Sequence, residues 1–391
     1  MSKKKTIVFV SSLVHPWGGS EELWKKSAII LKKTGYRVIV FKENVEYQNP
    51  AIKDLVDAGI KIKDIGYSST SFLKKLTIKI RRTLIKGLNS IHTNLLGKSI
   101  HHYKFRKHIR KIKPDLVVVA QSMNFDGIQY AAECISFNLP YVIIAQKAVE
   151  TKWLVPAERV ISIQSYQLAK ACYFVSNHNH NLTEEQLGVR LTNAHIVYNP
   201  IKVSRKALPL PKSEIISLAC IGRLCILDKG QDILLRILAR PIWRKRSISV
   251  SFIGSGEDED GLKALVRLLD LKNVEFIPFV ADIENLWKDY HALLLPSRYE
   301  GLPLAIMEAM AVGRTVITTN AGGNKEVIEN NVTGFIGEAN ENSFAEIMEC
   351  AWSKKDDWEN IGHNAHRFIS NNIPPSPENE FANTLMKLIH G

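Results

Sequence analysis

Short β-branched runs alternate with longer segments of helical periodicity along most of this chain, and this alternation restricts the fold more than any other feature. Segments such as Glu21–Lys33 and Phe125–Phe137 carry the helical pattern between the runs. Strands that are apolar on both faces are typical of parallel βαβ units, in which helices cover both sides of the sheet. The first series of predicted strands comprises Thr6–Val10, Arg37–Phe41, Leu116–Ala120, Tyr141–Ala145, Cys172–Ser176 and Ile196–Tyr198.

A second series of the same kind follows a Pro-rich stretch that has no helical pattern. Its predicted strands are Ile215–Ile221, Ile248–Ile253, Val274–Ile277, His291–Pro296 and Thr315–Thr318. We therefore expect an α/β protein with two doubly wound domains, whose ligands bind beyond the carboxyl ends of the strands. The predicted boundaries are 1–200 for the first domain, 201–213 for a linker, 214–370 for the second domain and 371–391 for a C-terminal helix.

The charge of the chain is concentrated in one segment. The sequence has 391 residues with 52 Lys and Arg against 39 Asp and Glu, and 13 of the basic residues lie between Ile65 and Pro114, where there is no acidic residue. Elsewhere the two kinds of charge balance, so the excess belongs to one predicted helical insertion at 70–113. Because 45% of the residues are hydrophobic and 23% are charged, wholesale disorder is excluded.

The same composition argues for a reduced, cytoplasmic protein. The apolar runs are far shorter than the ~20 residues of a membrane-spanning helix. Thr6–Val14 lacks a signal-peptide cleavage site and is better explained as the first strand. The five cysteines are odd in number and show no metal-ligand spacing.

The most informative motif runs from Arg298 to Met310, after a predicted strand. Pro303 suits the first turn of a helix, and the backbone N–H groups from Gly301 to Leu304 would then face a phosphate. Glu300 precedes this helix and Glu308 lies within it, where a carboxylate is costly without partners. These two residues suit the binding of sugar hydroxyls, although a surface Glu300 and a satisfied core Glu308 explain the spacing equally well.

A second cluster follows the first strand of the second series. Arg223 leaves the end of this strand, and Lys229 begins the next helical segment, so both side chains can point to the same strand edge. A guanidinium and an ammonium group beside a helix N-terminus are well suited to holding a diphosphate.

Taken together, these motifs resemble glycosyltransferase family 4. The resemblance rests on Arg223 with Lys229-Gly230, on the Glu300–Glu308 pair, and on Trp17-Gly18-Gly19-Ser20 after the first strand, in the order of the family. It implies the GT-B fold, in which two Rossmann-like domains face each other across the active site, and retaining sugar transfer from a nucleotide-sugar. The last helix in this family often crosses back to the first domain.

The resemblance also implies roles for individual residues. Arg223 and Lys229 would neutralise the donor diphosphate, Glu308 would bind the ribose, and Glu300 with the Gly301–Leu302 backbone would face the transferred sugar and its phosphates. Gly18 and Gly19 would let the N-terminal loop approach the diphosphate closely. The catalytic candidates are Glu300, Arg223 and Lys229, and the donor-binding candidates add Gly18, Gly19, Gly301, Leu302 and Glu308.

The chain departs from the family after Tyr141–Ala145, where Gln146 stands in place of the usual His. A glutamine can hydrogen-bond to a sugar but cannot carry a proton near neutral pH. Gln146, Asn124 and Asp126 are candidates for acceptor or sugar contact, while Ser122, Asn124 and Asp126 also fit ordinary turn and cap positions.

Two patterns that resemble cofactor sites carry little weight. Asp258-Glu259-Asp260 has the form of a metal-binding Asp-x-Asp motif, but acidic residues at this place suit the start of a helix. Gly254-Ser255-Gly256 lacks the third glycine of a dinucleotide fingerprint. We therefore expect no metal site and no cofactor, with the nucleotide-sugar acting as a substrate.

The basic segment has an apolar stripe with a helical period in Phe72–Leu88, surrounded by Lys and Arg. It fits either a solvated helical insertion or a surface that lies on an anionic membrane, at the inner face of the cytoplasmic membrane. Nucleic acid is not expected as a partner, because few aromatic residues are interleaved with the charges.

The sequence thus predicts a retaining, metal-independent glycosyltransferase that uses a glycan or a lipid-linked glycan as acceptor. The alternatives are another enzyme of the same fold, such as a sugar-nucleotide epimerase or a phosphorylase, and a nonenzymatic scaffold that binds polyanions or membranes. The sequence does not specify the nucleotide base, the sugar, the acceptor or the oligomeric state.

Overall fold

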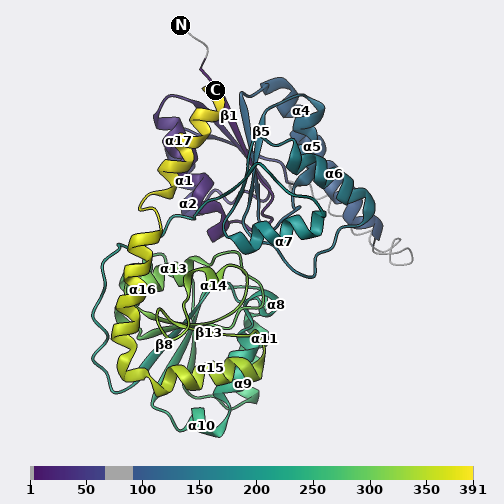
Figure 1. Cartoon of the computed structure of the whole chain (residues 1–391). Coiled ribbons are helices and arrows are strands. Elements are labelled where there is room, and N and C mark those ends of the chain that lie inside the picture. Colours follow the sequence, from purple (N-terminus) through teal and green to yellow (C-terminus); the bar gives the residue numbers. More distant parts are fainter. Residues whose placement is uncertain (1–3, 67–90, 391) are drawn as a thin grey trace.

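The computed structural model describes residues 4–66 and 91–390, with the side chains of the second part described from residue 102 onward. It contains two parallel α/β sheets, each covered by helices on both faces, as the strand pattern predicted (Figure 1). The predicted apolar stripe of Phe72–Leu88 lies outside the described residues.

The first sheet has seven parallel strands in the order β3-β2-β1-β4-β5-β6-β7. Its central strands are buried at every position because helices cover both faces. The strand bounds are β1 Thr6–Ser11, β2 Arg37–Lys42, β3 Lys61–Asp64, β4 Leu116–Gln121, β5 Tyr141–Ala145, β6 Cys172–Phe174 and β7 Ala194–Ile196.

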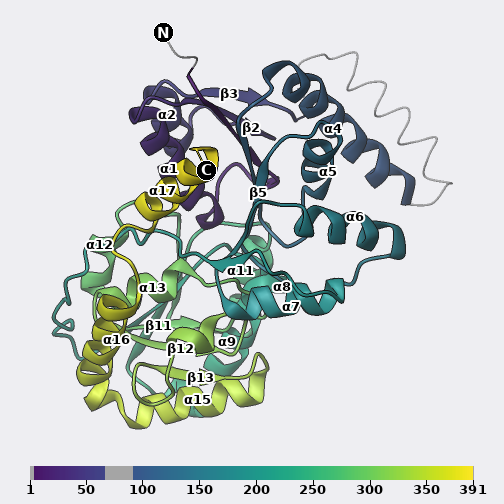
Figure 2. The ribbon, with the colours of Figure 1, turned by 45° about the horizontal axis from the view of Figure 1, so that its top comes forward.

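Two layers of helices enclose this sheet. The hydrophobic cluster on one face includes Trp24 of α1 (Glu22–Lys33), Leu55 of α2 (Pro50–Asp57) and Phe381 of α17 (Pro377–His390). The other face is covered by α4 (Ile91–Ile112), α5 (Ile128–Ser136) and α6 (Pro156–Gln167), with α7 (Asn177–Leu187) packed beside α6 (Figure 2).

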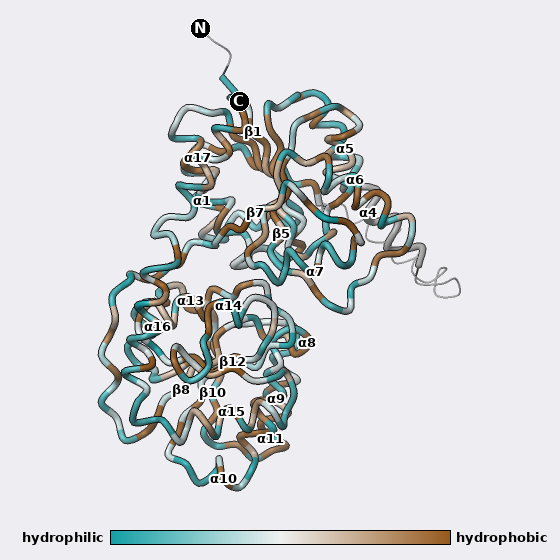
Figure 3. The backbone as a smooth tube through the Cα atoms, in the orientation of Figure 1, coloured by the Kyte–Doolittle hydropathy of each residue, from teal (hydrophilic) through white to brown (hydrophobic). Residues whose placement is uncertain are grey.

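The second sheet has six parallel strands in the order β10-β9-β8-β11-β12-β13. These strands are β8 Ile216–Ile221, β9 Ile248–Ile253, β10 Val274–Ile277, β11 Ala292–Leu295, β12 Thr315–Thr319 and β13 Phe335–Gly337. Coloured by hydropathy, the inner strands of both sheets are apolar runs within a more polar shell (Figure 3).

The helices of this half lie on both faces of its sheet. One hydrophobic cluster joins it to α9, α11 and α15, and a second joins it to α12, α13 and α16. The helices in chain order are α8 Ile226–Lys229, α9 Gln231–Leu238, α10 Pro241–Arg244, α11 Glu259–Leu268, α12 Ile283–Leu286, α13 Leu304–Ala311, α14 Asn324–Val327, α15 Glu341–Ser353 and α16 Trp358–Asn372.

Two edge strands and the first residue of one strand differ from the sequence expectation. The strands β3 and β13 are short and lie at sheet edges, and Lys61–Asp64 contains more charged than apolar residues, so neither produced an apolar run. The expected strand Ile196–Tyr198 begins two residues earlier, at Ala194, because the weakly apolar Ala194 and His195 pair with β6.

The C-terminal helix α17 returns to the first sheet after α16 has packed on the second (Figure 1). The Ser27 hydroxyl of α1 donates to the Glu378 carbonyl at 3.0 Å. The ring of Phe381 meets that of Tyr173 edge-on, with 5.0 Å between the centroids. Since Phe381 is 2% exposed, the last helix completes the core of the first half.

We expect Phe381→Ala to lower the free energy of unfolding by about 3 kcal/mol, because it leaves a cavity between α17 and the first sheet. Chemical denaturation monitored by circular dichroism measures this loss. Leu268→Ala is the matched control, since Leu268 is also in a helix but is 81% exposed. An equal, small effect of both substitutions would contradict the packing of α17.

Candidate functional site

The carboxyl ends of strands from both sheets meet where the two halves of the molecule face each other. Arg223 follows β8, and the segment from Ser297 to Gly301 follows β11, its neighbour in the second sheet. Ion pairs and hydrogen bonds join this edge to the loops that follow β1 and β5 of the first sheet. The site is therefore at the strand edges where doubly wound sheets bind ligands.

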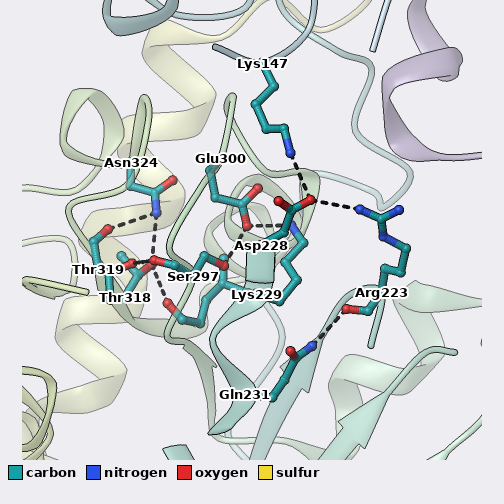
Figure 4. Close-up of polar contacts among 11 residues, drawn as sticks. Lys147, Arg223, Asp228, Lys229, Gln231, Ser297, Glu300, Thr318, Thr319 and Asn324 are labelled. Atoms are coloured by element: carbon teal, nitrogen blue, oxygen red, sulfur yellow. Dashed lines mark hydrogen bonds and ion pairs between the residues drawn. The ribbon is translucent and has the colours of Figure 1, made fainter. Parts of the chain in front are cut away.

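Glu300 is a buried carboxylate held by two donors. Its Oε1 atom accepts from Lys229 Nζ at 2.6 Å and from Ser297 Oγ at 2.7 Å (Figure 4). Glu300 is 5% exposed, so the Lys229 ammonium supplies the charge that its burial requires. The structure thus brings together two of the three predicted catalytic residues.

Arg223 and Lys147 converge on the carboxylate of Asp228. The Oδ2 atom of Asp228 lies 2.9 Å from Arg223 Nη2 and 2.9 Å from Lys147 Nζ. Burial opposes ionisation of Asp228, but Lys147, Arg223 and Lys229 outweigh it and hold the pKa of this carboxyl below its ordinary value. Arg223 also contacts His15, in the loop after β1.

Two glycines near the start of α13 lie so close to backbone atoms that neither has room for a side chain. A Cβ atom on Gly301 would lie 1.9 Å from the Gln146 carbonyl oxygen, and one on Gly322 would lie 2.2 Å from that of Glu300. Pro303, at the N-cap of α13, makes no side-chain cap hydrogen bond, and Ile306 is the first residue of the helix whose N–H group donates to the Pro303 carbonyl oxygen, at 3.2 Å. The residues before Ile306 carry the positive end of the helix dipole. Leu302, one residue after Gly301, is buried. This geometry is suited to binding an anion.

Glu308 lies inside α13 in an almost completely buried position. Burial raises its pKa to about 7, against the opposing charge of Lys202. The Lys202 backbone N–H approaches its Oε1 atom at 3.4 Å, and the Lys202 ammonium pairs instead with Glu22 at 2.9 Å. A carboxyl in such a place can donate or accept a hydrogen bond to a ligand hydroxyl.

The N-terminal glycine loop lies against the same helix. A Cβ atom on Gly19 would lie 3.2 Å from Leu304 Cδ1, at the beginning of α13. Gly18 is in an extended conformation that any residue can adopt, so its backbone does not require glycine. The close contact at Gly19 brings the loop after β1 to the N-terminal end of α13.

The side chains of the predicted acceptor residues are hydrogen-bonded to groups other than Glu300 and Glu308. Gln146 is buried and exchanges two amide hydrogen bonds with Asn199, at 2.7 and 3.2 Å. Asn124 is fully buried, and its amide donates to Thr183 and Gln186. The remaining candidate, Asp126, accepts from Ser122 and Lys152.

Neither cofactor-like pattern forms a cofactor site in the described residues. The Asp258 carboxylate accepts from the Ile226 N–H, and Glu259 opens α11. Across residues 4–66 and 91–390, no group of three or more His, Cys, Asp or Glu side chains is arranged to hold a metal. The metal requirement of the reaction therefore stays a prediction.

Four residues at the site were not predicted from the sequence. Ser297 and Asp228 each lie within three residues of a predicted one, but short polar residues after a strand are too common to signal a site. Lys147 directly follows Gln146, and His15 precedes Gly18 by three residues. The roles of Lys147 and His15 depend on contacts between the two halves, which no local sequence pattern encodes.

The second half of the chain matches a known protein family. Residues 216–354 match the family described as "Glycosyl transferases group 1", and this segment contains Arg223, Lys229, Glu300 and Glu308. This segment of the chain is thus similar to the group 1 glycosyltransferases. A Haemophilus influenzae glycosyltransferase is 34% identical over 154 residues, which are 36% of this chain and 42% of the relative. The capsular polysaccharide biosynthesis glycosyltransferase CapM of Staphylococcus aureus is 29% identical over 154 residues, covering 39% of this chain and 40% of CapM. The chain thus covers about two fifths of each of these relatives.

Solved structures extend the likeness to the whole chain. Anabaena HepE in complex with UDP superimposes with a TM-score of 0.73 over 98% of this chain and all of HepE, at 18% identity. HepE in complex with UDP-glucose gives a TM-score of 0.72 at 19% identity, over 98% of this chain and 99% of HepE. At this identity the likeness establishes the fold, and it confirms the predicted GT-B architecture.

The stability of the protein should depend on pH through Glu308. Since burial raises the folded-state pKa of Glu308 from 4.5 to about 7, the folded protein retains a proton that the unfolded chain releases between these values. Stability therefore falls as pH rises through this window, by at most about 3 kcal/mol. Glu308→Gln should remove this slope in chemical denaturation at pH 4.5–8.

The control for this series is Glu346→Gln, which changes an exposed carboxyl on α15. It should leave the slope of the unmodified protein in place. If Glu308→Gln and Glu346→Gln gave the same pH dependence, the burial of Glu308 would not be the cause.

Proposed function

We propose that this protein is a retaining glycosyltransferase that moves a sugar from a UDP-sugar to a glycan or a lipid-linked glycan. The main observation is that two cations are held at neighbouring strand ends beside the start of α13, within the family-matched segment: Lys229 pairs with the buried Glu300, and Arg223 pairs with Asp228. The likeness to CapM and the complexes of HepE with UDP and UDP-glucose support the reaction class and the uridine nucleotide.

The donor would lie along the carboxyl edge of the second sheet. Its diphosphate would take the place between Arg223, Lys229 and the first amides of α13, where charge-assisted hydrogen bonds are strongest. Its ribose would reach Glu308 in the same helix, and Gly18 with Gly19 would allow the loop after β1 to cover the phosphates. Gly301 and Leu302 would present backbone rather than side chains to the sugar phosphate.

Transition-state stabilisation would come mainly from charge on the departing diphosphate. Breaking the sugar–phosphate bond moves negative charge onto the β-phosphate, where Arg223 and Lys229 are already oriented by carboxylates. Gln146 cannot accept a proton, so we infer that a departing phosphate oxygen removes the proton of the acceptor hydroxyl. Glu300 would hydrogen-bond to the transferred sugar, and two fixed cations would make a metal ion unnecessary.

Release of UDP from UDP-sugars tests the activity. We expect release to depend on a glycan or lipid-linked acceptor, whereas an epimerase would convert the donor without releasing UDP and a scaffold would do neither. Arg223→Ala should lower kcat/KM by about 100-fold or more, as expected for the loss of a charged donor to the transition state. Arg267→Ala, which removes an exposed arginine of α11, should have no effect.

The outer surface of the first half supports an association with anionic membranes. The helix α4 contains no acidic residue, and Arg106, Lys107, Arg110 and Lys111 are exposed on it. No helix within the described ranges is long and apolar enough to cross a bilayer. We infer that the enzyme works as a peripheral protein at the anionic cytoplasmic leaflet, where each basic residue contributes about 1 kcal/mol.

The neighbouring helix α6 adds apolar side chains to this surface. Val160 and Ile161 of α6 and Leu168, directly after this helix, are 58%, 44% and 60% exposed. Trp153, in the loop before the helix, is 67% exposed. Since α5 packs against both α4 and α6, the cations and these apolar side chains belong to the same helical layer. Basic and apolar residues together are typical of interfacial binding.

Binding to vesicles tests the membrane association. Sedimentation with phosphatidylglycerol vesicles should decrease steeply with salt, and replacement of Lys107, Arg110 and Lys111 by Gln should weaken it about tenfold or more. Replacement by Gln of three exposed cations of the second half, Lys245, Arg267 and Lys272, removes the same amount of charge. This control should change vesicle binding little. Binding that is equally sensitive to both triple variants would refute a localised surface.

A further inference from the structure

Lys147 is a residue of the first half whose charged end lies in the second. It comes directly after Gln146, beyond the end of β5, and its Nζ atom lies 2.9 Å from the Asp228 carboxylate (Figure 4). Its backbone is fixed, because its carbonyl oxygen accepts from the Asn124 N–H at 2.7 Å and the next N–H, of Ala148, donates to Asn179. The ammonium group is therefore held at the strand edges that form the candidate site.

Two cations share one oxygen atom of Asp228. Lys147 Nζ and Arg223 Nη2 each lie 2.9 Å from Oδ2, with side chains that are 21% and 35% exposed. Two like charges this close repel each other, and an anion between them offsets the repulsion by attracting both. A phosphate oxygen carries the same charge as this carboxylate oxygen and accepts the same hydrogen bonds.

The backbone beside Lys147 contacts Gly301, in the loop before α13. A Cβ atom on Gly301 would lie 1.9 Å from the Gln146 carbonyl oxygen. The peptide bond between Gln146 and Lys147 therefore packs directly on Gly301. The position of Lys147 thus follows from two independent contacts, one made by its side chain and one by its backbone. Both lead to the group of residues that contains Arg223, Lys229 and the start of α13.

We propose that Lys147 is a third cation for the donor diphosphate, and that Asp228 holds the Lys147 ammonium group in position until the nucleotide-sugar binds. This inference rests on the proposed function and adds to it that the first half of the protein supplies charge to the donor site. On donor binding the Lys147 ammonium moves from the carboxylate to a phosphate oxygen. The bound diphosphate then connects the two halves in place of Asp228.

A double-mutant cycle on UDP affinity tests this role. Isothermal titration calorimetry with UDP should show that Lys147→Gln weakens binding about tenfold or more. The decisive comparison is Lys147→Gln in the Asp228→Asn background, where we expect the same loss to persist because the ammonium contacts the phosphate directly. If Lys147 only neutralises Asp228, the substitution has no effect in that background, and the proposal is overturned.

Lys152→Gln is a matched control. Lys152 is a similarly half-buried lysine of the same loop, and its ammonium donates to Asp126 at 2.9 Å. It should leave UDP affinity unchanged, and Lys147→Arg should restore most of the affinity that Lys147→Gln loses. Uridine, which has no phosphate, should bind all variants equally, and a Lys147→Gln loss that extends to uridine would indicate a structural role and refute the proposal.

UDP binding and UDP release by the unmodified protein distinguish a failure of this inference from a failure of the proposed function. If it binds no nucleoside diphosphate, the proposed function fails, and the inference fails with it. If it binds UDP and releases UDP from UDP-sugars, but the Lys147 loss disappears in the Asp228→Asn background, only the assignment of Lys147 is wrong. Thermal unfolding of each variant shows whether it folds, and Lys147→Arg tests the same position should Lys147→Gln be unstable.

Discussion

The ion pair between Lys229 and Glu300 is the interaction on which the rest of the candidate site depends. Both groups are largely removed from water, and each would be costly there without the other. Their pairing requires β8 and β11 to be neighbours, because Lys229 follows the first strand and Glu300 follows the second. The parallel order of the second sheet thus determines where positive charge can be held, and Arg223, Asp228 and the start of α13 are arranged around it.

Contacts between backbones set the distance between the two halves. Gly301 lies against the Gln146 carbonyl oxygen, and a Cβ atom on Gly323 would lie 2.5 Å from Ser176 Cβ. Next to this contact, the Glu326 carboxylate accepts from the N–H groups of Asn177 and His178 at the start of α7. These contacts hold the strand edges of the two sheets close enough for side chains of the first half to reach the donor residues of the second.

The sequence predicted the features that arise from local pattern. Buried parallel strands produce continuous apolar runs, so the two sheets could be recognised, together with helices such as α1 and α5, whereas the edge strands β3 and β13 could not. Arg223, Lys229 and Glu300 lie after predicted strands or at helix starts, and Glu308 lies inside the helix that follows Glu300. The structure brings the first three into one polar cluster. The Asp228 bridge to Lys147, the Gln146–Asn199 pair and the burial of Asn124 arise from contacts between distant segments, which a pattern along the chain does not contain.

The position of α17 has a consequence for synthesis on the ribosome. Phe381, Ala382 and Leu385 belong to the same hydrophobic cluster as Ile7 and Trp24, so residues made first are covered by residues made last. At about 5–20 residues per second, the first sheet, which is complete at the end of β7, waits about 10 to 40 s for its final helix. During this interval one apolar face of the nascent domain stays partly uncovered, and we expect it to be a site where chaperones bind or where truncated chains aggregate.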